Sequence, residues 1–340
     1  MARKKILVTG GAGFIGGNFV QFIVNKYPNY DIYNLDLLTY AGDLTKHKQI
    51  EEKKNYTFIK ADISDRKFII ELFKKEEFDY VIHFAAESHV DRSIKDPGIF
   101  IETNVTGTQV LLDASKEVGV TKFVHVSTDE VYGELDFDPS TFFTEETPIQ
   151  PNSPYSASKA SSDLLVRAYH ETYGLPVNIT RCSNNYGPYH FPEKLIPLTI
   201  SRVLNDQKVP VYGDGKNIRD WLHVIDHCAA IDLVMHKGEN GEVYNVGGHN
   251  ERTNLEVVQT IIKELDKSDD LIEFVKDRLG HDKRYAIDPT KLEELGWEPI
   301  YTFDTGIAQT IRWYLDNKEW WEQIINGDYR DYFKAQYTTV

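Results

Sequence analysis

The sequence predicts an α/β protein in which a doubly wound parallel sheet carries a smaller, interleaved C-terminal domain. Two observations predict the sheet. Short apolar runs alternate with segments of helical spacing through the first half of the chain, and the runs are nearly continuous, as in strands buried on both faces. A third observation predicts the second domain, because after about residue 181 this rhythm loosens into pieces punctuated by proline and glycine. At 340 residues, the chain has room for two domains of about 150 residues each.

Six strands are predicted along the first half of the chain. In order, they are residues 5–9, 31–35, 56–59, 80–84, 123–126 and 177–180. The helices expected between them are residues 14–27, 67–76, 99–118 and 156–173. The pattern is a repeated βαβ unit, whose crossovers place helices on both faces of the sheet.

The second half of the chain returns once to this pattern. Residues 226–235 show helical spacing, and residues 243–246 form a strand-like run that we expect to rejoin the large sheet. We therefore assign residues 1–180 plus about 220–248 to the sheet domain, and about 181–219 plus 249–340 to the smaller domain. An aromatic stripe in the tail is expected to pack within the fold; it includes Trp313, Trp320, Trp321, Tyr329, Tyr332 and Phe333.

The composition excludes several classes of protein. Lys and Arg number 38 against 53 Asp and Glu, a net charge of −15, which argues against a binder of nucleic acid or anionic membranes. Any phosphate must then be bound by helix N-termini, glycine-rich backbone and a few placed basic side chains. Two cysteines without a Cys/His cluster predict neither a disulfide framework nor a metal site. No apolar run approaches the roughly 18 residues of a membrane span, and we expect a cytoplasmic protein.

A glycine-rich turn, Gly10-Gly11-Ala12-Gly13-Phe14-Ile15-Gly16, follows the first strand. Gly11, Gly13 and Gly16 fit the spacing G-x-G-x-x-G, while Gly10, Gly13 and Gly16 equally fit the wider G-x-x-G-x-x-G. Glycines here permit a tight turn and let the backbone approach a pyrophosphate, and the following helix N-terminus supplies amide donors. Asp36 ends the second strand, where a carboxylate binds the ribose 2′-hydroxyl of NAD and repels the 2′-phosphate of NADP. The motif therefore predicts a Rossmann-like, NAD-binding domain.

Two further strand ends border the same expected cleft. Asp62-Ile63 follows the third strand, where Asp62 either contacts adenine or caps a helix. Phe84-Ala85-Ala86 follows the fourth strand, and its two small side chains permit close approach of a ligand.

Tyr155 and Lys159 stand four positions apart on an expected helix and so share one face. A phenol with its usual pKa of about 10 is a poor base at neutral pH, but a nearby ammonium and the positive nicotinamide of NAD⁺ favour the phenolate. Tyr155 could then take the proton of an alcohol as hydride leaves for NAD. Such pairs also occur by chance on helix surfaces, and the upstream dinucleotide motif is what makes this one informative.

Together, these residues resemble the extended short-chain dehydrogenase/reductase family. The resemblance covers nearly the whole chain. It implies a Rossmann domain, Tyr155 and Lys159 as catalysts, and a smaller C-terminal domain that holds a nucleotide sugar. Motif and resemblance together predict these cofactor contacts: Gly10, Gly13, Phe14, Ile15, Gly16, Asp36, Leu37, Thr39, Asp62, Ile63, Phe84, Ala85, Ala86, Ser88, Thr103, Tyr155, Lys159 and Asn185.

Within this family, the segment Ser127-Thr128-Asp129-Glu130 narrows the expected chemistry. Epimerase-like members have no adjacent acids here, whereas the Asp-Glu pair resembles the 4,6-dehydratases of nucleotide sugars. The implied reaction converts dTDP-glucose to dTDP-4-keto-6-deoxyglucose and water by C4 oxidation with bound NAD, elimination across C5 and C6, and hydride return to C6. Glu130 would remove the C5 proton, Asp129 would protonate the departing C6 hydroxyl, and Thr128 would hydrogen-bond O4.

The resemblance also implies a set of substrate contacts. They are Ser88, Thr128, Asn184, Glu193, Lys194, Leu195, Pro210, Tyr212, Arg219, Asn254, Arg278 and His281. Tyr212 would stack near the base, and Arg219 would meet the diphosphate, to which a planar guanidinium can make two bonds. Leu279 stands where the family often has proline, which leaves the rigidity of the loop around Arg278 open.

Several alternatives stay open at this point. An NAD-dependent nucleotide-sugar 4-epimerase shares everything except the acid pair, which could instead cap a turn, and a non-catalytic NAD-binding regulator needs no chemistry. The preference for dTDP over UDP or GDP is not decided either. The family usually dimerises by packing two helices from each subunit, here residues 99–118 and 156–173, so we expect a homodimer. His89 and Arg92 could belong to a subunit contact.

Overall fold

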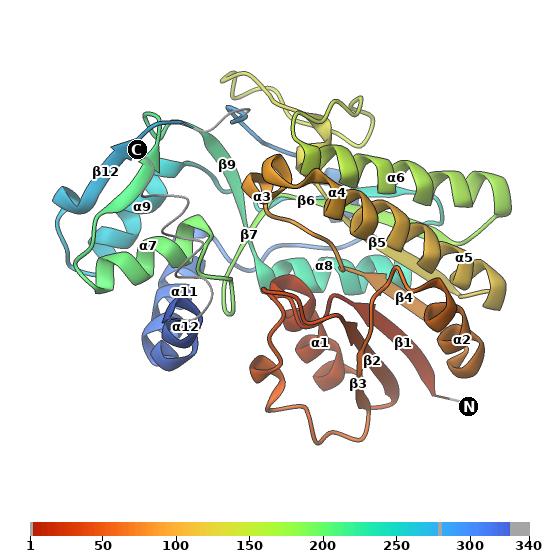
Figure 1. Ribbon diagram of the computed structural model, residues 1–340. Helices are drawn as coiled ribbons and strands as arrows, with labels where there is room; N and C mark the ends of the chain where they lie inside the picture. The colour runs from red at the N-terminus through yellow and green to blue at the C-terminus, as the bar shows by residue number, and fades with distance from the viewer. Residues whose placement is uncertain (1–2, 278–280, 327–340) are drawn as a thin grey trace.

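A seven-stranded parallel sheet forms the centre of the larger lobe (Figure 1). The computed structural model describes residues 3–277 and 281–326. The strands of this sheet are β1 (Lys4–Thr9), β2 (Tyr30–Asp36), β3 (Tyr56–Lys60), β4 (Tyr80–His83), β5 (Lys122–Thr128), β6 (Val177–Cys182) and β10 (Val243–Val246). Their spatial order is β10-β6-β5-β4-β1-β2-β3, and every neighbouring pair is parallel. The predicted Rossmann-like, doubly wound sheet is confirmed, including the return of residues 243–246 to it.

The strand order reverses at β1, which pairs with β2 on one side and with β4 on the other. At its carboxyl end, Thr9 lies opposite Leu35 of β2 and His83 of β4. Open α/β sheets bind ligands in the crevice at such a switch point. The glycine-rich turn begins at the next residue, so it stands at the mouth of that crevice.

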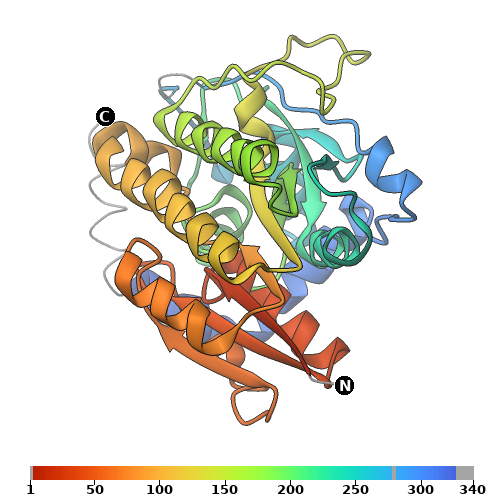
Figure 2. The same cartoon turned by 90° about the vertical axis from the view of Figure 1, so that its right-hand side faces the viewer.

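Two layers of helices cover the sheet, because successive side chains of a strand point to opposite faces. Ile6 and Val8 of β1 belong to the core shared with α1 (Phe14–Lys26) and α8 (Val224–Lys237). Leu7 belongs to the core shared with α2 (Arg66–Glu76), α5 (Thr108–Val118) and α6 (Pro154–Tyr173). Figure 2 shows α2, α5 and α6 side by side, with α8 across the sheet from them. Burial on both faces explains the nearly continuous apolar runs.

The helix predicted over residues 99–118 is interrupted. The chain forms α4 (Pro97–Phe100), then a π-helix (Ile101–Gly107), then α5. Within the π-helix, the buried Asn104 amide accepts from the Glu87 N–H and donates to the Glu87 carbonyl and the Ser158 hydroxyl. These tertiary bonds accompany the wider turn, and hydrophobic spacing does not reveal them.

The smaller lobe contains two short sheets. β7 (Asn184–Tyr186), β9 (Ile218–His223) and β11 (Glu251–Thr253) form one, while β8 (Val209–Tyr212) and β12 (Ile272–Val275) form the other. The other helical segments of the described chain are α3 (Val90–Lys95), α7 (Leu195–Leu204), α9 (Asn254–Glu264), α10 (Thr290–Glu294), α11 (Phe303–Asp316), α12 (Lys318–Asn326) and 3₁₀ turns at Thr45–His47, Asp129–Tyr132 and Asp269–Leu271. Leu292 of α10 and the nearby Trp297 pack in the core of the large sheet, although they follow the smaller lobe in sequence.

The aromatic tail packs on the smaller lobe as far as the structure describes it. Trp321 is 1% exposed and shares a core with Tyr314 and Tyr186. Tyr329, Tyr332 and Phe333 lie outside the described residues. Within the described ranges, none of the helices combines the length and apolar character that crossing a membrane requires.

Candidate active site

A cavity of about 470 Å³ lies between the carboxyl ends of the parallel strands and the smaller lobe. Every residue predicted to contact the cofactor lines it. Thr128, Asp129 and Glu130, which follow β5, line the same cavity. The structure therefore brings the glycine turn, the acid pair and the Tyr-Lys helix face together around one space.

The glycine turn presents backbone to this cavity. Gly10 has a φ of +72°, and a Cβ on it would stand 2.5 Å from the backbone nitrogen of Ala85, so only glycine fits. Gly13 precedes α1, and a Cβ there would meet only the Gly10 carbonyl oxygen, at 3.2 Å, so its free side faces the cavity. Gly11 packs on Asn34 instead. The glycines that line the cavity are therefore those of the wider G-x-x-G-x-x-G spacing, Gly10, Gly13 and Gly16. A backbone cradle at a helix N-terminus fits the diphosphate of a dinucleotide.

Two carboxylates lie at the carboxyl ends of β2 and β3, where both line the cavity. Asp36 accepts hydrogen bonds from the backbone N–H groups of Ala12 at 2.9 Å and Leu38 at 2.8 Å, so it also fastens the glycine turn to β2. Each oxygen keeps a second lone pair for a ribose hydroxyl. Asp62 accepts from the backbone and the hydroxyl of Ser64, both at 2.8 Å, whereas Asp65 is the residue that caps α2.

Tyr155 and Lys159 share the buried face of α6, whose start is fixed by a capping box between Ser153 and Ser156. The Lys159 ammonium donates to the Val126 carbonyl at 2.9 Å, and burial lowers its pKa to about 8. Burial also raises the pKa of Tyr155 well above its usual value, and nearby acids raise it further. The protein's own charges thus keep the phenol protonated at neutral pH, and the positive nicotinamide ring is the opposing charge that favours the phenolate.

Asp129 and Glu130 differ in their surroundings. Asp129 is 2% exposed, and burial, together with the charges of Glu130 and Asp220, raises the pKa of its carboxyl well above the usual range. Its Oδ2 is buried without a hydrogen-bond partner among the described residues. Thr128, not either acid, caps the turn that follows, by accepting from the Glu130 N–H. These surroundings favour the protonated form of the Asp129 carboxyl, which lines the cavity.

The predicted substrate contacts divide into two groups. Ser88, Thr128, Asn184, Glu193, Lys194 and Leu195 line the cavity. Pro210, Tyr212, Arg219, Asn254 and His281 do not line it, and Arg278 lies outside the described residues, as does Leu279. Arg219 donates to the Asp282 carbonyl at 2.9 Å, and its guanidinium lies 4.2 Å from the centre of the Tyr285 ring. Tyr212 and His281 are neighbours, with ring centres 6.1 Å apart.

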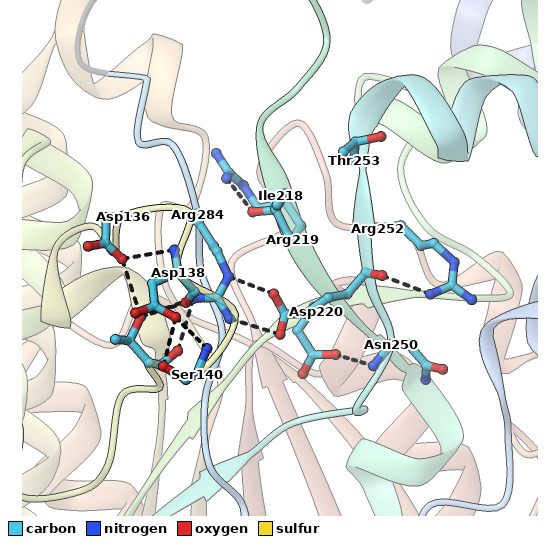
Figure 3. A network of polar contacts seen from close by, with 12 residues as sticks. Asp136, Asp138, Ser140, Ile218, Arg219, Asp220, Asn250, Arg252, Thr253 and Arg284 are labelled. Atoms are coloured by element: carbon cyan, nitrogen blue, oxygen red, sulfur yellow. Dashed lines mark hydrogen bonds and ion pairs between the residues drawn. The ribbon is translucent and has the colours of Figure 1, made fainter.

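A polar network beside Arg219 joins the two lobes (Figure 3). Arg284, which is 1% exposed, donates to both oxygens of Glu251 at 2.7 and 3.0 Å and to the carbonyls of Asp138 and Thr141, both at 2.9 Å. Asp220 accepts from the backbone of the segment before β11. The loop that follows the acid pair is thereby tied to the smaller lobe.

Sequence reasoning missed several residues that line the cavity. Lys46, Tyr189 and Trp320 all do so. The Trp320 indole donates to Asp43 at 2.6 Å, so one aromatic of the tail contributes to the cavity rather than only to packing. The carboxylate of Glu193 accepts from the Tyr40 hydroxyl at 3.1 Å across the two lobes. No motif links these positions, because the contacts span long stretches of chain. Within the described ranges, no group of His, Cys, Asp and Glu is arranged to hold a metal ion.

Known proteins resemble this chain over nearly its whole length. Residues 7–310 match the family model described as GDP-mannose 4,6 dehydratase. A dTDP-glucose 4,6-dehydratase of Xanthomonas campestris pv. campestris is 54% identical over 343 residues, which cover 95% of this chain and 97% of that protein. An Escherichia coli protein of the same name is 51% identical over 353 residues, with coverages of 96% and 97%. The chain belongs to the dTDP-glucose 4,6-dehydratase family.

Solved structures agree with membership of the dTDP-glucose 4,6-dehydratase family. The Bacillus anthracis enzyme, in complex with NAD, gives a TM-score of 0.88 at 52% identity, covering 94% of this chain and 99% of that one. The Streptomyces venezuelae enzyme DesIV, also with NAD bound, gives 0.90 at 48% identity with the same coverages. A UDP-glucose 4-epimerase of Thermus thermophilus gives 0.84 at 30% identity, with coverages of 92% and 99%, and is the more distant of these relatives.

Proposed function

We propose that this chain is an NAD-dependent dTDP-glucose 4,6-dehydratase, a hydro-lyase that forms dTDP-4-keto-6-deoxyglucose and water. The observation that carries the proposal is the acid pair Asp129 and Glu130, which lines one cavity with Tyr155 and Lys159. Oxidation at C4 is common to epimerases, whereas elimination of water also needs an acid and a base. Relatives that are 54% and 51% identical bear this enzyme's name.

NAD is the proposed cofactor, because the glycine cradle and Asp36 fit its diphosphate and ribose, and structures of relatives contain it. When bound, it accepts a hydride from C4 and returns one to C6, so it is regenerated in each cycle. We assign its contacts as the sequence predicted them. The division into a cofactor domain (1–180 plus about 220–248) and a substrate domain (about 181–219 plus 249–340) is likewise part of the proposal.

In the oxidation step, Tyr155 takes the proton of the C4 hydroxyl. Thr128 lies beside the Tyr155 phenol and lowers its pKa, so its hydroxyl is suited to orient O4. Lys159 adds a positive charge on the same buried face of α6, and its hydrogen bond to the Val126 carbonyl holds the ammonium in place. The buried phenol is a weak base until the nicotinamide ring is present, which couples proton removal to cofactor binding.

In the elimination step, one carboxyl of the pair acts as the base and the other as the acid. Glu130, the more exposed of the pair, removes the C5 proton, which the C4 ketone makes acidic. Asp129 gives its proton to the departing C6 hydroxyl, because burial raises the pKa of its carboxyl well above the usual range and so favours the protonated acid. Where two neighbouring carboxyls differ in burial in this way, the buried one is suited to be the acid and the more exposed one to be the base.

The proposed substrate site runs from the cavity into the smaller lobe. Ser88, Asn184, Glu193, Lys194 and Leu195 are assigned to the part inside the cavity. Pro210, Tyr212, Arg219, Asn254 and His281, with Arg278, are assigned to the nucleoside diphosphate outside it. Arg219 supports this division, because it does not line the cavity but is close enough for its charge to lower the pKa of Asp129, against the larger effect of burial.

We also propose a homodimer, formed through α6 and its neighbours. On α6, the exposed residues Ala157, Leu164 and Ala168 stand seven and four positions apart and form a small apolar stripe. Ile99 of α4 and Ile101 of the π-helix, 45% and 50% exposed, belong to segments that contact α6. An apolar helix face of this kind packs into a four-helix arrangement with a second copy. Sedimentation of the wild type and of Leu164→Glu tests it, since a charge there should give a monomer.

A cytoplasmic location is the remaining part of the proposal. Cys182 and Cys228 are both buried and unpaired, which agrees with a reducing compartment.

The decisive experiment is incubation with dTDP-glucose followed by mass spectrometry. We expect the sugar nucleotide to lose one water and to gain a ketone. Recovery of dTDP-galactose would instead identify an epimerase. Parallel reactions with UDP-glucose and GDP-mannose measure base preference. Tyr155→Phe should bind NAD and lose turnover, whereas a non-catalytic regulator would retain its cellular role with this variant.

A further inference from the structure

Lys46 is a buried lysine beside the glycine turn, and it has no part in the proposed oxidation and elimination steps. It lies in the 3₁₀ turn Thr45–His47, after β2, and is 3% exposed. Its ammonium donates to the carbonyls of Ala12 and Gly13, both at 2.8 Å. The side chain also lines the cavity. A positive charge therefore lies beside the proposed diphosphate cradle.

This charge is not neutralised by an ion pair. Within residues 3–277 and 281–326, no carboxylate forms a salt bridge with Lys46, although Asp36 and Asp43 act on it from farther away. Burial lowers the pKa of its ammonium to about 8. The other titratable neighbours are neutral at pH 7, since burial lowers the pKa of His47 to about 4 and raises that of Tyr189. A desolvated cation without a paired anion is costly, and an anionic ligand would remove that cost.

The Lys46 ammonium keeps one N–H donor for a ligand. An ammonium has three N–H donors, and the two loop carbonyls occupy two of them. Among the described residues that line the cavity, the lysines and arginines are Lys46, Lys159 and Lys194, and burial lowers the pKa of the lining His190 to about 3. Lys159 stands at the catalytic tyrosine and Lys194 on the smaller lobe, so Lys46 is the cation at the glycine turn.

The surroundings of Lys46 hold it in place. Asp43 donates its N–H to the Ala12 carbonyl at 2.9 Å and accepts from the Trp320 indole at 2.6 Å. The Tyr189 ring lies 5.9 Å from the ammonium and packs on Trp320. Segments from both lobes thus exclude water from the lysine, which strengthens its interaction with any bound anion.

We propose that Lys46 is a cofactor-binding residue, which fixes the glycine turn through Ala12 and Gly13 and places its positive charge at the diphosphate of the dinucleotide. This inference rests on the proposed use of NAD. It explains how a chain with a net charge of −15 holds a doubly charged diphosphate with one placed cation besides backbone amides.

The test is calorimetric titration of cofactor-free protein with NAD, ADP-ribose and adenosine. Lys46→Met keeps the apolar stem and removes the charge. We expect it to weaken binding of NAD and ADP-ribose about tenfold or more, since charge-assisted bonds are lost, and to leave adenosine binding within about twofold. Lys48→Gln, the same loss of charge at an exposed position two residues away, is the matched control and should change none of the three.

A second test measures the affinity of the wild type for ADP-ribose and adenosine over a series of pH values, so it does not depend on a variant that folds. ADP-ribose affinity should fall as the pH rises through the Lys46 pKa, near 8 or above it once the diphosphate is bound, while adenosine affinity stays level. The pKa of Lys159 is also about 8, so the series is repeated on Lys159→Met, which should retain the fall.

The outcomes separate the two proposals. Equal affinity of Lys46→Met and wild type for ADP-ribose, or an equal loss for adenosine, would overturn the role of Lys46. A level pH series in the wild type would do the same. Failure of the wild type to bind NAD at all would overturn the proposed function instead.

Discussion

Replacing Asp129 by asparagine should divide the reaction at its second step. Asparagine has almost the same shape but no acidic proton, so C4 oxidation should proceed while elimination stalls. Asp129 is 2% exposed, and burial raises the pKa of its carboxyl well above the usual range, which favours the protonated form that a general acid needs. Loss of a general acid slows a step by about 10²- to 10⁴-fold, or about 2.7 to 5.4 kcal/mol of barrier.

The assay for this variant is a single turnover with dTDP-glucose, followed by the near-ultraviolet absorbance of reduced cofactor. The wild type should show little absorbance and form product, whereas Asp129→Asn should accumulate the reduced cofactor and form product slowly. Asp232→Asn, a buried aspartate on α8 that lies outside the cavity, controls for the chemical change and should behave as wild type. Failure of Asp129→Asn to reduce the cofactor, or unchanged product formation, would refute the assigned role.

Three further predictions concern the base, the cradle and the link between lobes. Glu130→Gln should stop solvent deuterium from entering C5, and rapid exchange seen by NMR would exclude it as the base. Gly13→Ala should weaken NAD binding at least about tenfold without unfolding, because its methyl enters the cavity. Gly10→Ala should lower the free energy of unfolding by more than the about 1 to 2 kcal/mol that its positive φ costs, because the new Cβ would also stand 2.5 Å from the backbone nitrogen of Ala85. Calorimetry measures the first effect and thermal melting the second. Glu251→Gln should lower the free energy of unfolding by about 3 kcal/mol in denaturant titrations, because the buried Arg284 loses its carboxylate, and an unchanged midpoint would contradict this.

The larger lobe was predictable because its signals are local. Apolar runs of strand length separated by helical spacing define βαβ units, and β1 to β6 fall where those runs do. The glycine turn and Asp36 lie at strand ends, so the topology of a parallel sheet brings them to one edge. The π-helix was not predictable, because the buried bonds of Asn104 that accompany it depend on neighbours elsewhere in the fold.

The parts of the site that sequence did not reveal depend on contacts between distant segments. Lys46 reaches Ala12 across 34 positions, and Trp320 reaches Asp43 across 277, with no motif that connects them. An aromatic stripe at helical spacing predicts packing, and Trp320 shows that one member of it can also line a cavity. The contribution of Asp220 to the raised pKa of Asp129 required the fold as well, since Asp220 lies on β9 of the smaller lobe.

The central claim is that one hydride travels within a single sugar from C4 to C6. Turnover of dTDP-glucose that carries deuterium at C4, followed by NMR of the product, tests it directly. We expect a 4-keto-6-deoxy sugar with the deuterium at C6. A product that keeps deuterium at C4, as dTDP-galactose would, or a dehydrated product that lacks the label, would contradict it.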